Sequence, residues 1–167
     1  RASDALRTFR VHYRLSRVAV ASDHVVAVNL QVWGSEWEQS LGRLTARTTG
    51  PGAVVKAWGH PVWVRGDVAL QGTNALLRAL DVPARQYVEL RALYPRKAFT
   101  STAGMRVEEG DGLERIVAEE LEDSQTYERD QERLDEALAH PARTALLILA
   151  IGTLPAVLLS LLVFWRF

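Results

Sequence analysis

The feature that most constrains this chain is residues 145–165, a run of 21 residues without one charged side chain. As a helix, the run would extend about 31 Å, close to the roughly 30 Å of a bilayer's hydrocarbon core. A buried core helix is the alternative, but a domain of this size has too little protein to cover such a helix on all sides. Trp165 suits a membrane interface, and Pro155 and Gly152 permit a kink. The run therefore predicts one transmembrane helix, with the lipid bilayer as a partner.

The formal net charge of zero conceals a segregation of charge along the chain. Residues 1–107 hold 15 Lys and Arg against 7 Asp and Glu, whereas residues 108–136 hold 3 Arg against 13 Asp and Glu. The two parts could attract each other or simply stay solvated. Alternatively, the basic part could face an anionic partner such as lipid headgroups or a cell-wall polymer. We expect no nucleic-acid partner.

Short stretches of β-type sequence, separated by Gly and Pro about every ten residues, fill the first part of the chain. Residues 8–15 alternate strictly, with apolar side chains on one face and basic ones on the other, as in a half-buried strand. Further strands are expected in residues 25–32, 42–48, 53–58, 60–66, 67–72, 75–80 and 86–94. The pattern predicts a mainly β fold, an immunoglobulin-like antiparallel β-sandwich.

A long acidic helix is expected over residues 112–139, because no Gly or Pro interrupts residues 113–140. Asp111 is placed to cap its first turn, and Glu114 stands three residues later, as a capping box requires. Pro141 ends it, since proline disfavours helical geometry in the preceding residue. The apolar stripe expected to dock on the sandwich is Leu113, Ile116, Val117 and Leu121. Heptad spacing further along is weak, so a solvated or domain-packed helix and a dimerising stalk both remain open.

These elements predict three parts: a β-sandwich domain (1–107), an acidic juxtamembrane helix (108–140) and a transmembrane helix (141–167). The chain begins at Arg1 rather than Met, so we expect a segment of a longer polypeptide, whose remainder beyond Phe167 is a further partner. Arg143 and Arg166 flank the apolar run on either side, and they do not decide its orientation. The expected location is the cell membrane, single-pass within this segment, with the β-domain outside the cytoplasm.

Few residues suggest catalysis or metal binding. The chain has no Cys, which excludes a disulfide framework, a thiolate zinc site and a cysteine nucleophile. Its four His show no close ligand spacing, and there is neither a G-x-S-x-G nucleophile elbow nor a glycine-rich phosphate loop. We therefore expect no catalytic residue, no cofactor and no metal, and a protein that is not an enzyme.

Tryptophan is the more suggestive residue type. Trp33 and Trp37 frame the sequence WGSEW, and Trp58 and Trp63 frame WGHPVW, which contains His60. Indole rings at strand ends could line a ligand groove, because they combine a large apolar area with a polar N–H. They could equally cap the core of a small sandwich, with His60 as a turn residue. These five residues form the candidate ligand or partner surface.

Several motifs in order resemble a known family. They are FRVHYRL (9–15), VNLQVWGSEWEQSLGRLTA (28–46), VELRALYPRKAF (88–99) and IVAEELEDS (116–124). Together they resemble the YciQ-like bacterial membrane proteins, which carry an N-terminal domain of unknown function. The resemblance implies an exported β-domain followed by a membrane helix, and it supplies no established activity. The expected function is a binding or assembly module of the bacterial cell envelope, working with other membrane proteins or envelope components. The alternatives are an envelope enzyme at the Trp-rich strand ends and a sensory input domain of a receptor.

Overall fold

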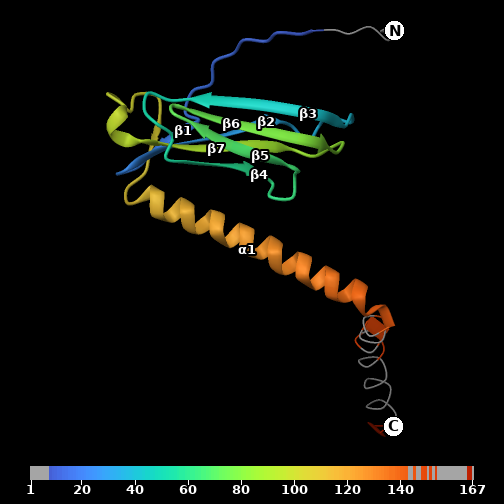
Figure 1. Cartoon of the computed structure of the whole chain (residues 1–167). Coiled ribbons are helices and arrows are strands. Elements are labelled where there is room, and N and C mark those ends of the chain that lie inside the picture. The colour runs from blue at the N-terminus through green and yellow to red at the C-terminus, as the bar shows by residue number, and fades with distance from the viewer. Residues whose placement is uncertain are drawn as a thin grey trace. The chain divides into compact units, whose positions relative to one another are not determined.

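A computed structural model describes residues 8–142 together with residues 145, 148, 149, 151, 153, 165 and 166 (Figure 1). The chain divides into two compact units, Arg1–Glu119 and Glu120–Phe167. Helix α1 (Gly112–Ala139) begins in the first unit and continues into the second. The strands all belong to the first unit: β1 (Ala19–Ala21), β2 (Val25–Trp33), β3 (Leu41–Thr49), β4 (Lys56–His60), β5 (Gly66–Gln71), β6 (Asn74–Val82), β7 (Val88–Pro95) and β8 (Arg106–Val107). A 3-10 turn, η1 (Arg96–Ala98), follows β7.

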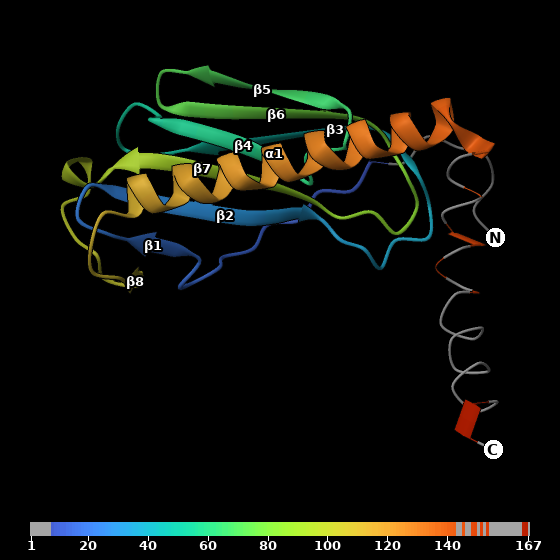
Figure 2. The same cartoon turned by 90° about the horizontal axis from the view of Figure 1, so that it is seen from below.

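The strands form two sheets, which confirms the mainly β prediction. The order β4-β7-β2-β1-β8 makes a five-stranded sheet, here called sheet A, and β3-β6-β5 makes a three-stranded sheet B (Figure 2). Neighbouring strands are antiparallel except β1 and β8, which run parallel. β7 and β2 are therefore central in sheet A, and each is hydrogen-bonded on both sides.

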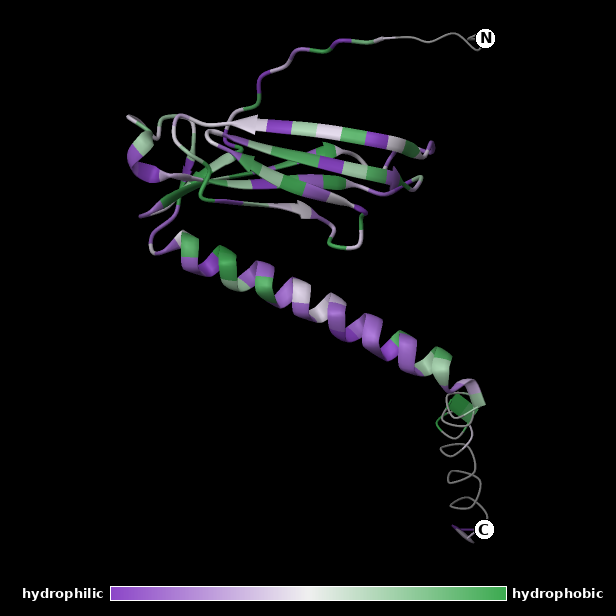
Figure 3. Ribbon diagram, viewed as in Figure 1, coloured by the Kyte–Doolittle hydropathy of each residue, from purple (hydrophilic) through white to green (hydrophobic). Residues whose placement is uncertain are grey.

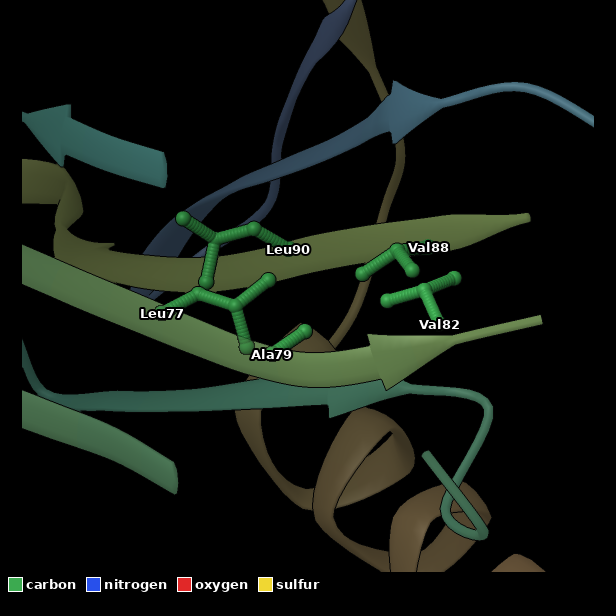
Figure 4. Packing of buried hydrophobic residues seen from close by; sticks show 5 residues of the cluster. All are labelled: Leu77, Ala79, Val82, Val88 and Leu90. Carbon is green, nitrogen blue, oxygen red and sulfur yellow. The ribbon is translucent and has the colours of Figure 1, made fainter. Parts of the chain in front are cut away.

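The main hydrophobic core lies between the two sheets. Leu77, Ala79 and Val82 of β6 face Val88 and Leu90 of β7 (Figure 4), and all five are at most 4% exposed. The two strands follow each other in sequence but belong to different sheets, so the loop between them carries the chain across the sandwich. Alternation of side chains along β7 then decides which residues reach this core.

A second apolar layer lies on the other face of sheet A, where the start of α1 packs. Val25, Ala27 and Leu93 of the sheet are buried with Ile116 of the helix, and Trp58 and Leu113 pack against this cluster. Gly112 is fully packed against Ser22, where any β-carbon would collide with the serine side chain. Ser22 is fixed in turn, since its backbone N–H and its hydroxyl both donate to the Val25 carbonyl oxygen. The first turns of α1 are thus a third layer on the sandwich.

The acidic helix forms as the sequence predicts. The Asp111 carboxylate accepts hydrogen bonds from the backbone N–H groups of Leu113 (2.9 Å) and Glu114 (3.2 Å), so it caps the helix N-terminus. The helix then runs from Gly112 to Ala139 and ends just before the His140-Pro141 pair. Colouring by hydropathy shows apolar residues concentrated in its first turns and a polar stretch beyond them (Figure 3).

Three local predictions were wrong. Residues 8–15 form no strand, and Phe9, the first apolar residue of the segment, is 87% exposed. Alternation fixes which face a residue occupies, but a strand also needs a neighbour for its hydrogen bonds, and no described strand pairs with this segment. The strand expected in residues 60–66 is instead the loop 61–65 between the end of β4 and the start of β5, in which Val64 N–H donates to the Pro61 carbonyl. Leu121, expected in the docking stripe, is 57% exposed. The short strands β1 and β8 were not predicted.

The predicted membrane span falls on residues 145–165, most of which lie outside the described residues. Among the residues that are described, no helix has both the length and the apolarity needed to cross a membrane.

Ile116 tests how strongly the helix start is held. It is 3% exposed, so replacing it with Ala should lower the free energy of unfolding by about 2–4 kcal/mol through lost burial and a cavity. Leu134→Ala is the matched control on the same helix, because Leu134 is 52% exposed and should cost less than about 0.5 kcal/mol. Denaturant unfolding of the full chain in detergent measures both, and equal effects would contradict the docked helix start.

Tyr94 tests the core at alkaline pH. Burial raises the pKa of the Tyr94 phenol above its ordinary 10.0, although its hydroxyl donates to Thr48 Oγ1 (3.1 Å), a hydrogen bond that acts in the opposite direction. The unfolded chain releases this proton first, so stability present below about pH 10 should be lost as pH rises towards the folded pKa. Tyr94→Phe should reduce that alkaline loss in pH-dependent denaturation, whereas Tyr13→Phe, at an exposed position, should leave it unchanged. Equal alkaline loss in Tyr94→Phe and the unaltered chain would refute the assignment.

Candidate functional site

Three loops gather at one end of the sandwich, on the right in Figure 1. They are residues 34–40 between β2 and β3, 61–65 between β4 and β5, and 83–87 between β6 and β7. Antiparallel pairing brings alternate connections to the same end of a sheet, so segments distant in sequence become neighbours. We call these residues the loop end. Trp37 and Trp63 lie in it, and Trp33 and His60 lie at its border, as the last residues of β2 and β4.

Hydrogen bonds tie the three loops together. The backbone N–H of Arg85 donates to the Trp37 carbonyl (2.8 Å), and the Arg85 guanidinium donates to Glu38 Oε1 (2.8 Å). The indole N–H of Trp63 donates to Gln86 Oε1 (3.1 Å). Loop 83–87 therefore contacts both of the others, and the loop end is a cross-linked surface.

Two tryptophans at the loop end are exposed. Trp37 is 52% and Trp63 is 56% exposed. Trp37 stacks on Trp33, with ring centroids 4.9 Å apart and planes inclined by 14°. Trp33 is half-buried and packs against the main core, so it supports the outer ring from beneath. The arrangement presents flat apolar faces to solvent at positions set by their neighbours.

Trp58 and His60 occupy different surroundings. Trp58 packs in the cluster beneath the start of α1, so the structure separates it from the other three tryptophans. His60 ends β4 and lines a pocket of about 170 Å³ at the border of the two sheets, near ion pairs between Arg65 and Asp81 and between Arg78 and Asp67. The floor of this pocket is apolar, formed by Val64, Val68, Leu77, Ala79 and Val88.

A chain of ion pairs joins sheet A to the start of α1. Arg91 Nη2 lies 3.1 Å from Glu119 Oε2, and the other oxygen of that carboxylate lies 2.8 Å from Arg115 Nη1. Arg115 Nη2 also lies 2.9 Å from Glu108 Oε2. The Arg91 side chain is only 20% exposed, so this contact is less screened by solvent than the surface pairs. We call Arg91, Glu119, Arg115 and Glu108 the junction network.

Sequence reasoning found the motifs of the junction network but missed their contact. VELR supplies Arg91, and IVAEE supplies Ile116 and Glu119. Two ordinary signals could have paired them: Arg91 shares a strand face with Leu93, and Ile116 shares a helix face with Glu119 at a spacing of three. The sequence could not show that the strand face with Arg91 and Leu93 packs against the helix face with Ile116 and Glu119.

The junction network can be tested against a surface pair of the same type. Arg91→Gln should lower the unfolding free energy by about 1–3 kcal/mol, because it leaves the partly buried Glu119 without this partner. Arg85→Gln removes a pair whose side chains are 72% and 71% exposed, and should cost less than about 1 kcal/mol. A double-mutant cycle with Glu119→Gln measures the coupling, and a coupling near zero would contradict a structural role.

Comparison with known proteins gives a family but no characterised relative. Residues 1–94 match the sequence model of a family described as the N-terminal domain of a predicted membrane protein, DUF2207. No curated protein and no solved structure matches the chain. The matched residues cover more than half of the chain. They include strands β1 to β6 and all of β7 except its last residue, Pro95. The resemblance to YciQ-like proteins is confirmed, and the chain belongs to the DUF2207 family of predicted membrane proteins, whose N-terminal domain is of unknown function.

Proposed function

We propose that this chain is a membrane-anchored, immunoglobulin-like β-domain outside the cytoplasm, which binds or assembles envelope components through its loop end. In this proposal the domain binds and does not catalyse. The membrane helix of residues 145–165 holds it at the bilayer, and the acidic helix stands between the two.

The anchor is supported by the solvent preference of residues 145–165. Where side chains in this run are described, large apolar ones are exposed: Ile148 is 68%, Leu149 64% and Ile151 73% exposed. At about 100° per residue these three alone spread over roughly 160° of a helix surface, wider than the stripe of an ordinary amphipathic helix. Lipid is the solvent that suits apolar side chains on so broad an arc.

The observation that carries the binding proposal is the pair of exposed indoles on a cross-linked surface. Exposed single apolar residues are common, but tryptophan is enriched where protein surfaces bind partners. Trp37 is held by its stack on Trp33 and by the Arg85 bond to its carbonyl, and Trp63 is held by Gln86. Such fixed rings lose little conformational entropy on binding, which favours affinity.

Site-specific photo-crosslinking in living cells tests the proposal. A photoreactive residue at Trp37 or Trp63 in the full-length protein should capture a defined envelope component. The same residue at Thr73, in the exposed hairpin at the opposite end of the sandwich, should not. Capture at Trp37 should fall at least about tenfold when Trp63 is changed to Ala, since loss of one anchoring tryptophan commonly costs 1.4 kcal/mol or more. Equal capture from both ends of the sandwich would refute a binding role for the loop end.

The junction network favours a second candidate, a sensory input domain. It connects central strand β7 to a helix that continues to Ala139. A shift of the strand would therefore move the helix start through the Arg91–Glu119 contact. A kinase or cyclase module further along the full-length protein would favour this reading. Further membrane helices followed by a Gly-rich tail would count against it.

A further inference from the structure

A basic pocket lies beside the junction network, on the outer face of sheet A. Its volume is about 240 Å³, and all of its lining residues belong to the first unit. Three arginines line it from three different elements: Arg91 from β7, Arg106 from β8 and Arg115 from α1. Its apolar lining residues are Val18, Val20 and Ala27 on the sheet side and Ile116 on the helix side, and its polar lining residues include Asn29, Ser22 and Glu108.

The register of sheet A explains why these side chains meet. Arg106 is paired with Val20, Val20 with Ala27, and Ala27 with Leu93, so the four residues form one row across four strands. Asn29 and Arg91 form part of the next row on the same face, two residues along the strands. Residues opposite each other or two apart point to the same side of a sheet. The helix start covers this side through Ile116, which closes the pocket over the sheet.

The three arginines at this pocket differ in their ion pairs. Three guanidinium groups line the pocket, and the carboxylates of Glu119 and Glu108 are among the groups that pair with Arg91 and Arg115. Glu119 is shared by Arg91 and Arg115, and Glu108 is bound by Arg115. Arg106 forms no ion pair with any residue in the described part of the chain. Arg106 thus supplies the pocket with a positive charge and with hydrogen-bond donors for an anion.

We propose that this pocket binds a phosphate group, presented by a small soluble phosphate compound or by a lipid headgroup. Guanidinium groups pair well with phosphate and carboxylate oxygens. Donors approaching from three elements suit a tetrahedral anion, whose oxygens point in several directions, better than a planar carboxylate with two. The apolar lining admits a short organic group attached to the phosphate. The site is separate from the loop end, so its failure would leave the proposed binding of an envelope partner untouched.

Two variants that each remove one charge should change the dissociation constant for phosphate in opposite directions. The probe is inorganic phosphate, titrated at constant ionic strength into the full chain in uncharged detergent, with binding followed by calorimetry. Arg106→Gln should raise the dissociation constant at least about tenfold, since it removes one charge-assisted donor. Glu108→Gln should lower it, because the Arg115 guanidinium is then released from a competing carboxylate. Arg65→Gln, which alters an exposed ion pair outside the pocket, is the control and should leave binding unchanged.

The outcomes separate the site from general attraction to positive charge. Equal weakening by Arg106→Gln and Arg65→Gln, or equal binding of acetate and phosphate, would overturn the proposal, as would the absence of any phosphate binding. Nanodiscs containing phosphatidic acid, compared with uncharged nanodiscs, distinguish the sources. If lipid phosphate occupies the pocket, the anionic nanodiscs should shift the phosphate titration to higher concentration, and Arg106→Gln should abolish this shift. That result assigns the phosphate to lipid. An unchanged titration assigns it to a soluble compound, and either result supports the site. Far-ultraviolet circular dichroism of each variant confirms that the sheet is intact.

Discussion

Strand β7 has to satisfy two different neighbours at once, and the rest of the first unit is arranged around that requirement. On one face, Val88, Leu90, Ala92 and Tyr94 enter the space between the sheets. On the other, Leu93 packs under Ile116 and Arg91 reaches Glu119. A central strand in a free-standing antiparallel sandwich usually shows one face to water. Here both faces are covered, so the start of α1 is as much part of the β-domain as any strand.

That double burial explains why the ion pairs of the junction network lie where they do. A polar row next to an apolar row on the same sheet face lets the helix dock by burial through Ile116 and by charge through Glu119. Burial is insensitive to direction, whereas a guanidinium–carboxylate contact fixes the rotation of the helix about its axis. Gly112 adds a steric limit, because only a residue without a side chain fits against Ser22. Together they fix the first turns of the helix on the sheet.

The loop end and the outer face of sheet A carry different chemistry. The loop end presents indole rings on a hydrogen-bonded frame, and the pocket near β8 presents guanidinium groups beside apolar lining residues. An aromatic surface suits an extended partner that lies across it, whereas the pocket suits a small group that enters it. The excess positive charge of residues 1–107 is therefore not spread evenly over the surface. Part of it lies at the helix junction, where it faces acidic residues at the start of α1.

The sequence by itself determined the local structures whose causes are local. Stretches of β-type sequence separated by turn residues located β2, β3, β6 and β7. Asp111 and Pro141 located the two ends of α1, because capping and proline geometry act within a few residues. Only the tertiary structure decided what depends on partners far away in the chain. The segment 8–15 has the pattern of a strand but pairs with no described strand. Trp58 packs at the helix junction, away from the other tryptophans. Arg106 lies beside Arg91 and Arg115 because β8 pairs in parallel with β1. The physical reason is that periodicity assigns a side chain to a face, whereas the hydrogen-bond register between distant strands assigns that face its neighbours.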